Sequence, residues 1–158
     1  MSGMNGLDVA VDLALSRRDA AAQVLANARQ AWVAAQVQQD QLESYAQECV
    51  TRWSQRANGC TPDLMRHHYQ FMERLHHAIA LQSGIIADQE RNVQREAVKL
   101  REAEGRLESL RQLLSVRQRE MQVALGRREQ KQSDEQAAMQ YRRRREQAGA
   151  NTNFGGGL

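Results

Sequence analysis

Four histidines and two cysteines are the residues of this chain best suited to metal or nucleophilic chemistry. The histidines form two adjacent pairs, His67-His68 and His76-His77, and the cysteines are Cys49 and Cys60. Adjacent side chains on a helix point about 100° apart, so one pair cannot easily hold a single ion. Two cysteines without a paired pattern indicate free thiols in a reducing cytoplasm. The sequence also has no nucleophile motif and no glycine-rich phosphate loop, so we predict no metal site, no cofactor and no enzyme.

A run of four arginines, Arg142 to Arg145, is the densest charge in the chain. It is either a solvated helix end or a weak site for acidic surfaces such as RNA or anionic lipid. Tyr141 is the one aromatic residue beside it, so base stacking is not expected. The net charge of +3 is mild, and no nucleic-acid partner is expected. A basic coiled-coil scaffold that binds RNA or anionic lipid is therefore kept as an alternative function.

The composition favours long helices over a globular core. Aromatic residues make up 4% of the chain and apolar residues 41%, much of it alanine, and there is one proline. Gln, Glu, Arg, Ala and Leu dominate, as in long helices. The N-terminus lacks the pattern of a secretory signal, and no stretch is long and apolar enough to span a bilayer. We therefore expect a cytoplasmic helical protein.

Apolar side chains recur at every seventh position in both halves of the chain. The first half carries Leu7, Ala14, Ala21, Ala28, Ala35, Leu42 and Cys49, and the second carries Met65, Met72, Ile79, Ile86, Val93, Leu100, Leu107, Leu114 and Met121. A repeat of seven held this long is typical of helices that wind around each other. The segment 58–63 (NGCTPD) lies between the two lines and is the one strong helix breaker.

Folding the chain back at this breaker places Leu42 opposite Ile79 and Cys49 opposite Met72, and keeps the two lines in register. We therefore predict an all-α fold, a long antiparallel two-helix coiled-coil hairpin with a longer, overhanging second helix. The predicted seam is Leu7, Val11, Ala14, Ala21, Leu25, Ala28, Trp32, Ala35, Met72, Ile79, Ile86, Val93, Leu100, Leu107, Leu110 and Leu114. The same register puts Gln39 against Gln82, which is either a polar layer that fixes alignment or a sign of a weak seam.

The predicted segments follow from these lines and from the breaker. They are a frayed N-terminus at 1–6, a first helix at 7–57, a turn at 58–62, a second helix at 63–147 and a flexible tail at 148–158. Beyond about residue 115 the second helix has no partner from the first. Thr61 or Asp63 could cap the second helix, and Pro62 suits a first helical turn.

An additional apolar stripe lies beside the seam near the turn. Phe71, Ala78 and Ile85 each precede a seam residue of the second helix, and Tyr45 lies in the corresponding zone of the first. A two-stranded coil has one seam and cannot bury both stripes. The stripe is therefore either a docking patch for a partner or a set of side chains that wrap over the seam.

Several features together resemble the flagellar type III export protein FliJ family, to which the YscO-type injectisome stalk proteins are related. The length and the two-helix plan fit this family. The segment 38–49 has Gln-Leu-Glu-Ser-Tyr at its centre, and a short glycine-containing turn follows. Next comes Tyr69-Gln70-Phe71, followed by Leu75, Ala78, Ile79 and Gln82. The resemblance covers roughly residues 7 to 125.

This resemblance implies a non-enzymatic stalk and adaptor, peripherally associated with the inner-membrane export apparatus and monomeric when free. It implies binding to a FliI-type export ATPase hexamer and promotion of its assembly, coupling to a FlhA-type export gate protein, and binding to export chaperones. The ATPase contact is expected around Leu13 to Gln23. An injectisome stalk of the same family and a homodimeric coil that never closes into a hairpin are the alternatives.

The family's binding patch maps onto both helices of this chain. Its members here are Gln38, Leu42, Tyr45, Cys49, Phe71, Leu75, Ala78 and Gln82. Cys49 stands where an aromatic residue is common in the family, and Gln82 where a histidine is common. On this mapping, Phe71→Ala or Leu75→Ala should weaken partner binding and leave helicity nearly intact.

Overall fold

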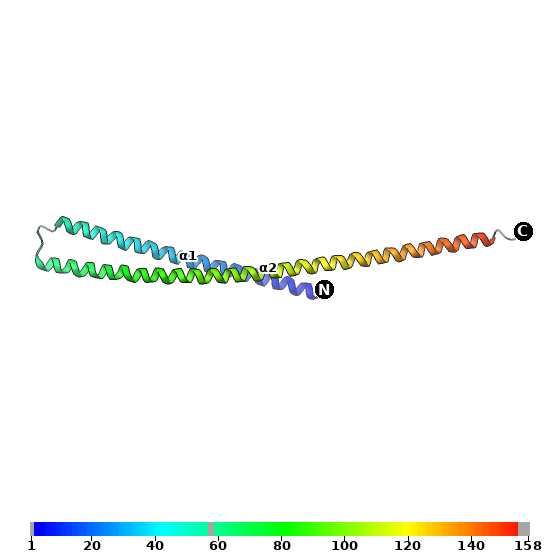
Figure 1. The fold of residues 1–158 in the computed structure, drawn as a ribbon, viewed down its shortest axis with the longest axis horizontal. Coiled ribbons are helices and arrows are strands. Elements are labelled where there is room, and N and C mark those ends of the chain that lie inside the picture. Colours follow the sequence, from blue (N-terminus) through cyan, green and yellow to red (C-terminus); the bar gives the residue numbers. More distant parts are fainter. Residues whose placement is uncertain (1, 57–58, 155–158) are drawn as a thin grey trace. The chain divides into compact units, whose positions relative to one another are not determined.

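The computed structural model describes residues 2–56 and 59–154, which form two helices (Figure 1). Helix α1 spans Ser2–Arg56 and helix α2 spans Pro62–Phe154, with 55 and 93 residues respectively. The prediction of an all-α, two-helix hairpin with the longer helix second is confirmed.

The helices extend further than the sequence predicts. Helix α1 begins at Ser2 rather than Leu7, and α2 continues to Phe154 instead of ending at residue 147. Gly6 and Gly149 lie within these extensions, but a single glycine costs a helix only about 1 kcal/mol and does not end it. Residues 1, 57–58 and 155–158, which include parts of the predicted frayed start, turn and tail, lie outside the described residues.

Thr61 caps the start of α2. The backbone N–H of Met65 donates to the Thr61 carbonyl at 3.1 Å, and the N–H of Leu64 donates to the Thr61 hydroxyl at 3.4 Å. Pro62 follows as the first helical residue, where its missing N–H costs nothing, and Asp63 places a negative charge in the first turn. Of the two capping residues that the sequence offers, the structure selects Thr61.

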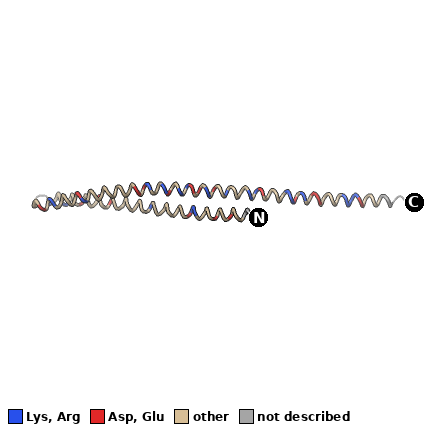
Figure 2. The backbone as a smooth tube through the Cα atoms, turned by 90° about the horizontal axis from the view of Figure 1, so that it is seen from below, with Lys and Arg blue, Asp and Glu red and all other residues tan. Residues whose placement is uncertain are grey.

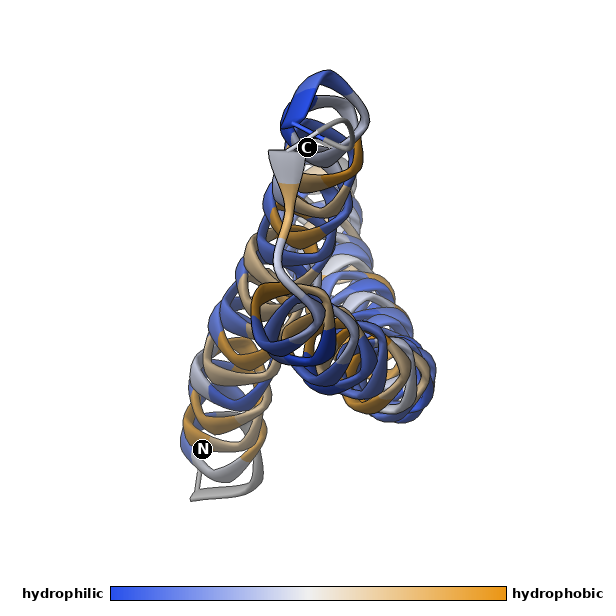
Figure 3. Cartoon of the chain, turned by 90° about the vertical axis from the view of Figure 1, so that its left-hand side faces the viewer, coloured by the Kyte–Doolittle hydropathy of each residue, from blue (hydrophilic) through white to orange (hydrophobic). Residues whose placement is uncertain are grey.

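Residues 9–108 form one compact unit, in which α1 and α2 pack as antiparallel partners. Its buried apolar side chains come from both helices, and they are Ala14, Leu25, Ala28, Ala35, Ala46, Met72, Leu75 and Leu107. The alanines belong to α1, and the larger side chains of α2 fill the space beside them. Hydrophobic and hydrophilic segments alternate along the helices in Figure 3, as a heptad pattern requires.

The antiparallel register agrees with the sequence prediction near the turn. One apolar cluster contains both predicted pairs, Leu42 with Ile79 and Cys49 with Met72, around Ala46 and Leu75. The same register places Trp53 opposite His68, and their rings stack with centroids 4.0 Å apart and an interplanar angle of 3°. The bend therefore lies where the two heptad lines require it.

The two glutamines of the predicted polar layer each bond to a residue of the facing helix. The Gln39 amide donates to the Ser83 hydroxyl at 2.6 Å, and the Gln82 amide donates to the Ala35 carbonyl at 2.9 Å. Both glutamines therefore bond across the seam, as members of a polar layer do, but not to each other. Long amides can reach one turn beyond the position they face, and a backbone carbonyl is a strong acceptor.

Every residue of the predicted seam is buried or half-buried. The heptad line of α2 is longer than its buried part, because Met65 and Met121 at its two ends are 42% and 37% exposed. The residue opposite Met65 in the register is Arg56, where α1 ends. The seam is thus limited by the length of α1.

Residues 109–154 belong to a second unit together with the first turns of α1. Leu7, Leu110 and Leu114 are half-buried there, and all described side chains from Val116 to Asn151 are exposed. Figure 2 shows positively and negatively charged residues scattered along this part of α2. Within the described residues, neither helix contains a stretch apolar enough to cross a bilayer.

Candidate partner-binding patch

The structure divides the predicted patch by depth. Three members, Gln38, Tyr45 and Phe71, are exposed, whereas Leu42, Cys49 and Ala78 are half-buried. Leu75 and Gln82 are buried, with exposed fractions of 8% and 6%. The patch therefore has an accessible surface layer and a supporting layer within the seam.

Tyr45 and Phe71 form the accessible centre of the patch. Their rings meet edge to face, with centroids 6.2 Å apart and an interplanar angle of 87°. This contact joins α1 to α2, yet Tyr45 stays 45% and Phe71 42% exposed. Aromatic rings supply large contact areas and are enriched in binding hot spots. The pair can therefore pack within the hairpin and still present apolar area to a partner.

Leu75 and Gln82 are buried, although the predicted patch is an exposed surface. Leu75 packs with Ala46 and Met72 in the apolar cluster, and Gln82 bonds to the Ala35 carbonyl. Leu75 and Gln82 are seven residues apart, and each follows a residue of the first heptad line, Met72 or Ile79, by three positions, so the helix turns them toward α1. This burial argues against the expectation that Leu75→Ala leaves helicity nearly intact, since the substitution would open a cavity in the seam.

The apolar surface continues beyond the predicted patch. Ile85 is 46% and Val24 47% exposed, and Ala31 is also exposed. Val24 and Ala31 precede Gln38 and Tyr45 at the same step of seven along α1. That spacing was the available signal for these two residues, but their small size made them less conspicuous than the aromatic pair.

The histidines are packing and surface residues in this structure. His68 stacks on Trp53 and also meets the Tyr69 ring edge to face, with centroids 5.9 Å apart. The other three histidines are exposed, and Cys49 and Cys60 are free thiols. Among the described residues, no group of three or more His, Cys, Asp or Glu side chains could hold a metal ion.

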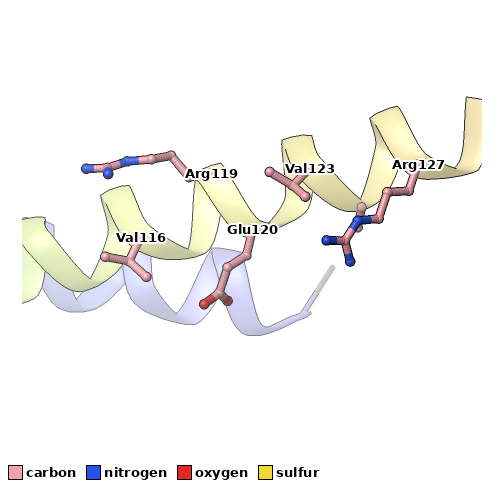
Figure 4. A pocket seen from close by; sticks show the side chains of 6 residues that line it. Val116, Arg119, Glu120, Val123 and Arg127 are labelled. Carbon is pink, nitrogen blue, oxygen red and sulfur yellow. The ribbon is translucent and has the colours of Figure 1, made fainter. Parts of the chain in front are cut away.

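The surface hollow drawn in Figure 4 is formed by one helix alone. Its lining residues all belong to α2, and they are Val116, Arg119, Glu120, Val123, Ala124 and Arg127. The valines, the arginines and Glu120 contain no nucleophile and no set of metal ligands. We interpret this hollow as an open amphipathic surface of α2.

A two-helix hairpin with a packed heptad seam belongs to the class of antiparallel coiled-coil proteins. Residues 4–146 match the family model described as Flagellar FliJ protein. The chain belongs to the FliJ family, which is a non-enzymatic component of the flagellar export apparatus. The sequence left open whether the export system is flagellar or an injectisome. The matched description names a flagellar protein. No curated protein and no solved structure matches the chain at a significant level.

Proposed function

We propose that this protein is the stalk and adaptor of the flagellar export machine, acting on the cytoplasmic side of the inner membrane. It binds a FliI-type ATPase hexamer and promotes its assembly, couples it to a FlhA-type gate protein, and binds export chaperones. The observation that carries this proposal is the half-exposed Tyr45–Phe71 pair on a two-helix hairpin of the FliJ family. A hairpin of this kind can engage partners along its length because its seam maintains the relative positions of its surface residues.

The two layers of the patch have different roles in this proposal. Tyr45, Phe71, Gln38 and the half-buried Ala78 contact the partner. The supporting residues are Leu42, Cys49, Leu75 and Gln82, which hold α1 and α2 at the separation that the surface layer needs. Substitutions in the surface layer should therefore affect binding, whereas substitutions in the supporting layer should affect folding first.

The ATPase contact lies around Leu13 to Gln23 of α1 in this proposal. Leu13 is 51% exposed there, and Arg17 and Ala20 are exposed as well. Arg18 is half-buried, and its Nε–H donates to Oδ1 of Asp19 at 2.8 Å. An apolar residue next to a free cation gives this segment both area and charge for a protein partner.

The Arg142 to Arg145 run supports the alternative, a scaffold for RNA or anionic lipid, less well. All four arginines are exposed on α2. Consecutive helical residues point about 100° apart, so the four guanidinium groups surround the helix and do not form a single basic face. A flat lipid surface would meet only part of this charge.

Phe71→Ala tests the proposed function directly. We expect binding to the cytoplasmic part of a FlhA-type gate protein to weaken by about thirtyfold, the effect of losing an aromatic hot spot. Titration calorimetry measures the affinity, and circular dichroism checks that the helices persist. Leu81→Ala is the matched control, because Leu81 is 59% exposed and lies outside the patch. Equal affinities for the two variants would contradict the proposal.

A further inference from the structure

A small hollow between α1 and α2 gathers three cations, and we call it the cation hollow. Its volume is about 180 Å³, and its lining residues are Ala14, Arg17, Lys99, Glu102, Ala103 and Arg106. Ala14 is buried and Ala103 half-buried, whereas all four charged residues are exposed. The two alanines of the seam therefore form the floor of the hollow, and the charged side chains surround its opening.

The cations of the hollow come from both helices and face each other across the seam. Arg17 precedes Tyr45 by four heptads in α1. Lys99 follows Phe71 by four heptads in α2, and Arg106 stands one heptad further on. Because the helices are antiparallel and the two shifts are equal, Arg17 lies beside Lys99 as the two aromatic rings lie beside each other. Like charges in this arrangement repel and lower the stability of a coiled coil.

The charges around the hollow do not neutralise each other. Lys99 bonds to Glu96 at 3.3 Å, but neither Arg17 nor Arg106 forms an ion pair with a described residue. The lining contains three positive side chains and one negative side chain, Glu102, so its net charge is +2.

The other flank of the seam shows the usual arrangement of charges in a coiled coil. There the register places Arg29 of α1 across from Glu90 of α2, so opposite charges face each other. The cation hollow instead brings together like charges in a concave site, which concentrates their field and attracts an anion. The repulsion between Arg17 and the cations of α2 is relieved when an anion lies between them.

We propose that the cation hollow binds a phosphate group, held by Arg17, Lys99 and Arg106. A phosphate monoester carries a charge of about −1.5 to −2 near pH 7, which matches the lining, whereas a carboxylate carries only one negative charge. Guanidinium groups donate two parallel hydrogen bonds to phosphate oxygens, and an ammonium group adds a third donor. Pockets for whole small molecules usually measure about 300–1,000 Å³, so this hollow has room for one phosphate group.

This inference goes beyond the proposed function and does not depend on it, although Arg17 belongs to the segment assigned to the ATPase contact. Titration of the full chain with inorganic phosphate at pH 7.5 and constant ionic strength tests it. The Nε–H signals of Arg17 and Arg106 in nuclear magnetic resonance spectra report binding at the site. We expect a Kd on the order of 1 mM, as a few exposed charged contacts provide.

Acetate decides between a phosphate group and a carboxylate. At the same ionic strength, acetate should bind at least about tenfold more weakly than phosphate, because its charge is smaller and it offers fewer acceptor oxygens. Equal or tighter binding of acetate would overturn the proposal in favour of an acidic side chain of a protein partner. Absence of any phosphate-dependent shift of the arginine signals would overturn it as well.

The double variant Arg17→Gln with Arg106→Gln locates the site. Phosphate should raise the urea midpoint of the original chain above its value in acetate, and should raise that of the double variant less. Arg29→Gln is the matched control, because Arg29 is an exposed arginine of α1 on the other flank, and it should respond as the original chain does. Equal responses of all three chains would overturn the proposal, because phosphate then acts only through its general effect on protein hydration.

The same measurements test the repulsion from which the proposal starts. In acetate, the double variant should have a higher urea midpoint than the original chain, because the facing cations are gone. A lower midpoint would mean that the arginines stabilise the hairpin without an anion, and the proposal would fail. Circular dichroism checks that all variants remain helical.

A further titration identifies the source of the phosphate group, which is either the free ion or a nucleotide. Adenosine monophosphate should bind as tightly as inorganic phosphate if the phosphate group alone is recognised. Binding more than about tenfold tighter, and lost with Arg17→Gln and Arg106→Gln, would assign the hollow to the phosphate end of a nucleotide. Tighter binding that persists in the double variant would overturn the assignment of the site.

This inference and the proposed function fail in different ways. Phe71→Ala should leave phosphate binding unchanged, because Phe71 lies four heptads from Lys99. If Phe71→Ala weakens binding to the gate protein and phosphate does not bind, the proposed function stands and the phosphate site is wrong. If phosphate binds through the two arginines but Phe71→Ala does not affect the gate protein, the phosphate site stands alone.

Discussion

Residues 9–56 and 62–108 form one α-helical region and residues 116–151 another, but the two regions are stabilised in different ways. In the first region, α1 and α2 bury side chains from both helices, and Gln82 bonds across the seam. In the second region every described side chain is exposed. The apolar heptad line explains the difference, because its last buried residue is Leu107, its last half-buried residue is Leu114, and Arg128 stands where the next residue after Met121 would fall.

The second region relies on local interactions along one helix. Gln130 donates to the Asp134 carboxylate at 3.1 Å, one turn away. Such pairs contribute about 0.2–0.5 kcal/mol each, and a single helix in water is only marginally stable. The comparison therefore indicates that the seam carries most of the stability of the hairpin, whereas the exposed part of α2 depends on helix propensity.

The largest expected effect is that of Leu75→Ala in the seam. Leu75 is 8% exposed and belongs to the cluster with Ala46 and Met72, so its truncation should cost about 2–5 kcal/mol. Urea unfolding followed by circular dichroism measures this change. Leu81→Ala is the matched control, because Leu81 is 59% exposed. If both variants lost the same stability, Leu75 would not be a seam residue.

Gln82→Ala should have a smaller effect on the seam. It removes the bond to the Ala35 carbonyl, which keeps its helical bond within α1, so we expect a loss of about 0.5–1.5 kcal/mol. The same unfolding experiment measures the loss, with Gln70→Ala as an exposed control. Gln82→Met keeps the volume without the bond and should recover part of the stability. Full stability of Gln82→Ala would mean that water replaces the amide at no cost.

The fold could be predicted from the sequence because its signal repeats. Seven-residue lines on both sides of one breaker define the helices, their direction and their register, and the Trp53–His68 stack agrees with that register. The polar contacts could not be predicted in the same way. Whether Gln39 reaches Gln82 or Ser83 depends on side-chain torsions that no periodicity specifies.

The candidate site could be predicted only in part. Tyr45 and Phe71 are conspicuous because aromatic residues are rare in this chain, and they are exposed as expected. Leu75 and Gln82 were placed on the patch by family resemblance, although the heptad pattern also assigns them to the seam. Burial depends on which side of a helix faces its partner, so the two assignments conflict until the packing is known.

The smallest expected effects are those of Gly84→Ala and Gly126→Ala, one in each region. Nothing lies within 4 Å of a Cβ atom built at either glycine, so both substitutions fit without strain. Each should stabilise its helix by up to about 1 kcal/mol. The stabilisation by Gly84→Ala and that by Gly126→Ala should appear in different measurements. Gly84→Ala should raise the urea midpoint of the whole hairpin, because its region unfolds together with the seam.

Gly126→Ala should leave the urea midpoint of the hairpin almost unchanged, because no seam residue lies near it in the sequence. Its effect should appear as slower amide hydrogen exchange between residues 119 and 133, by up to about fivefold. Gly105→Ala, which also has open space around its Cβ atom, provides a second variant within the seam region. If Gly126→Ala raised the urea midpoint as much as Gly84→Ala, the exposed part of α2 would unfold cooperatively with the seam. Its stability would then depend on the seam, contrary to the difference in burial between the two regions.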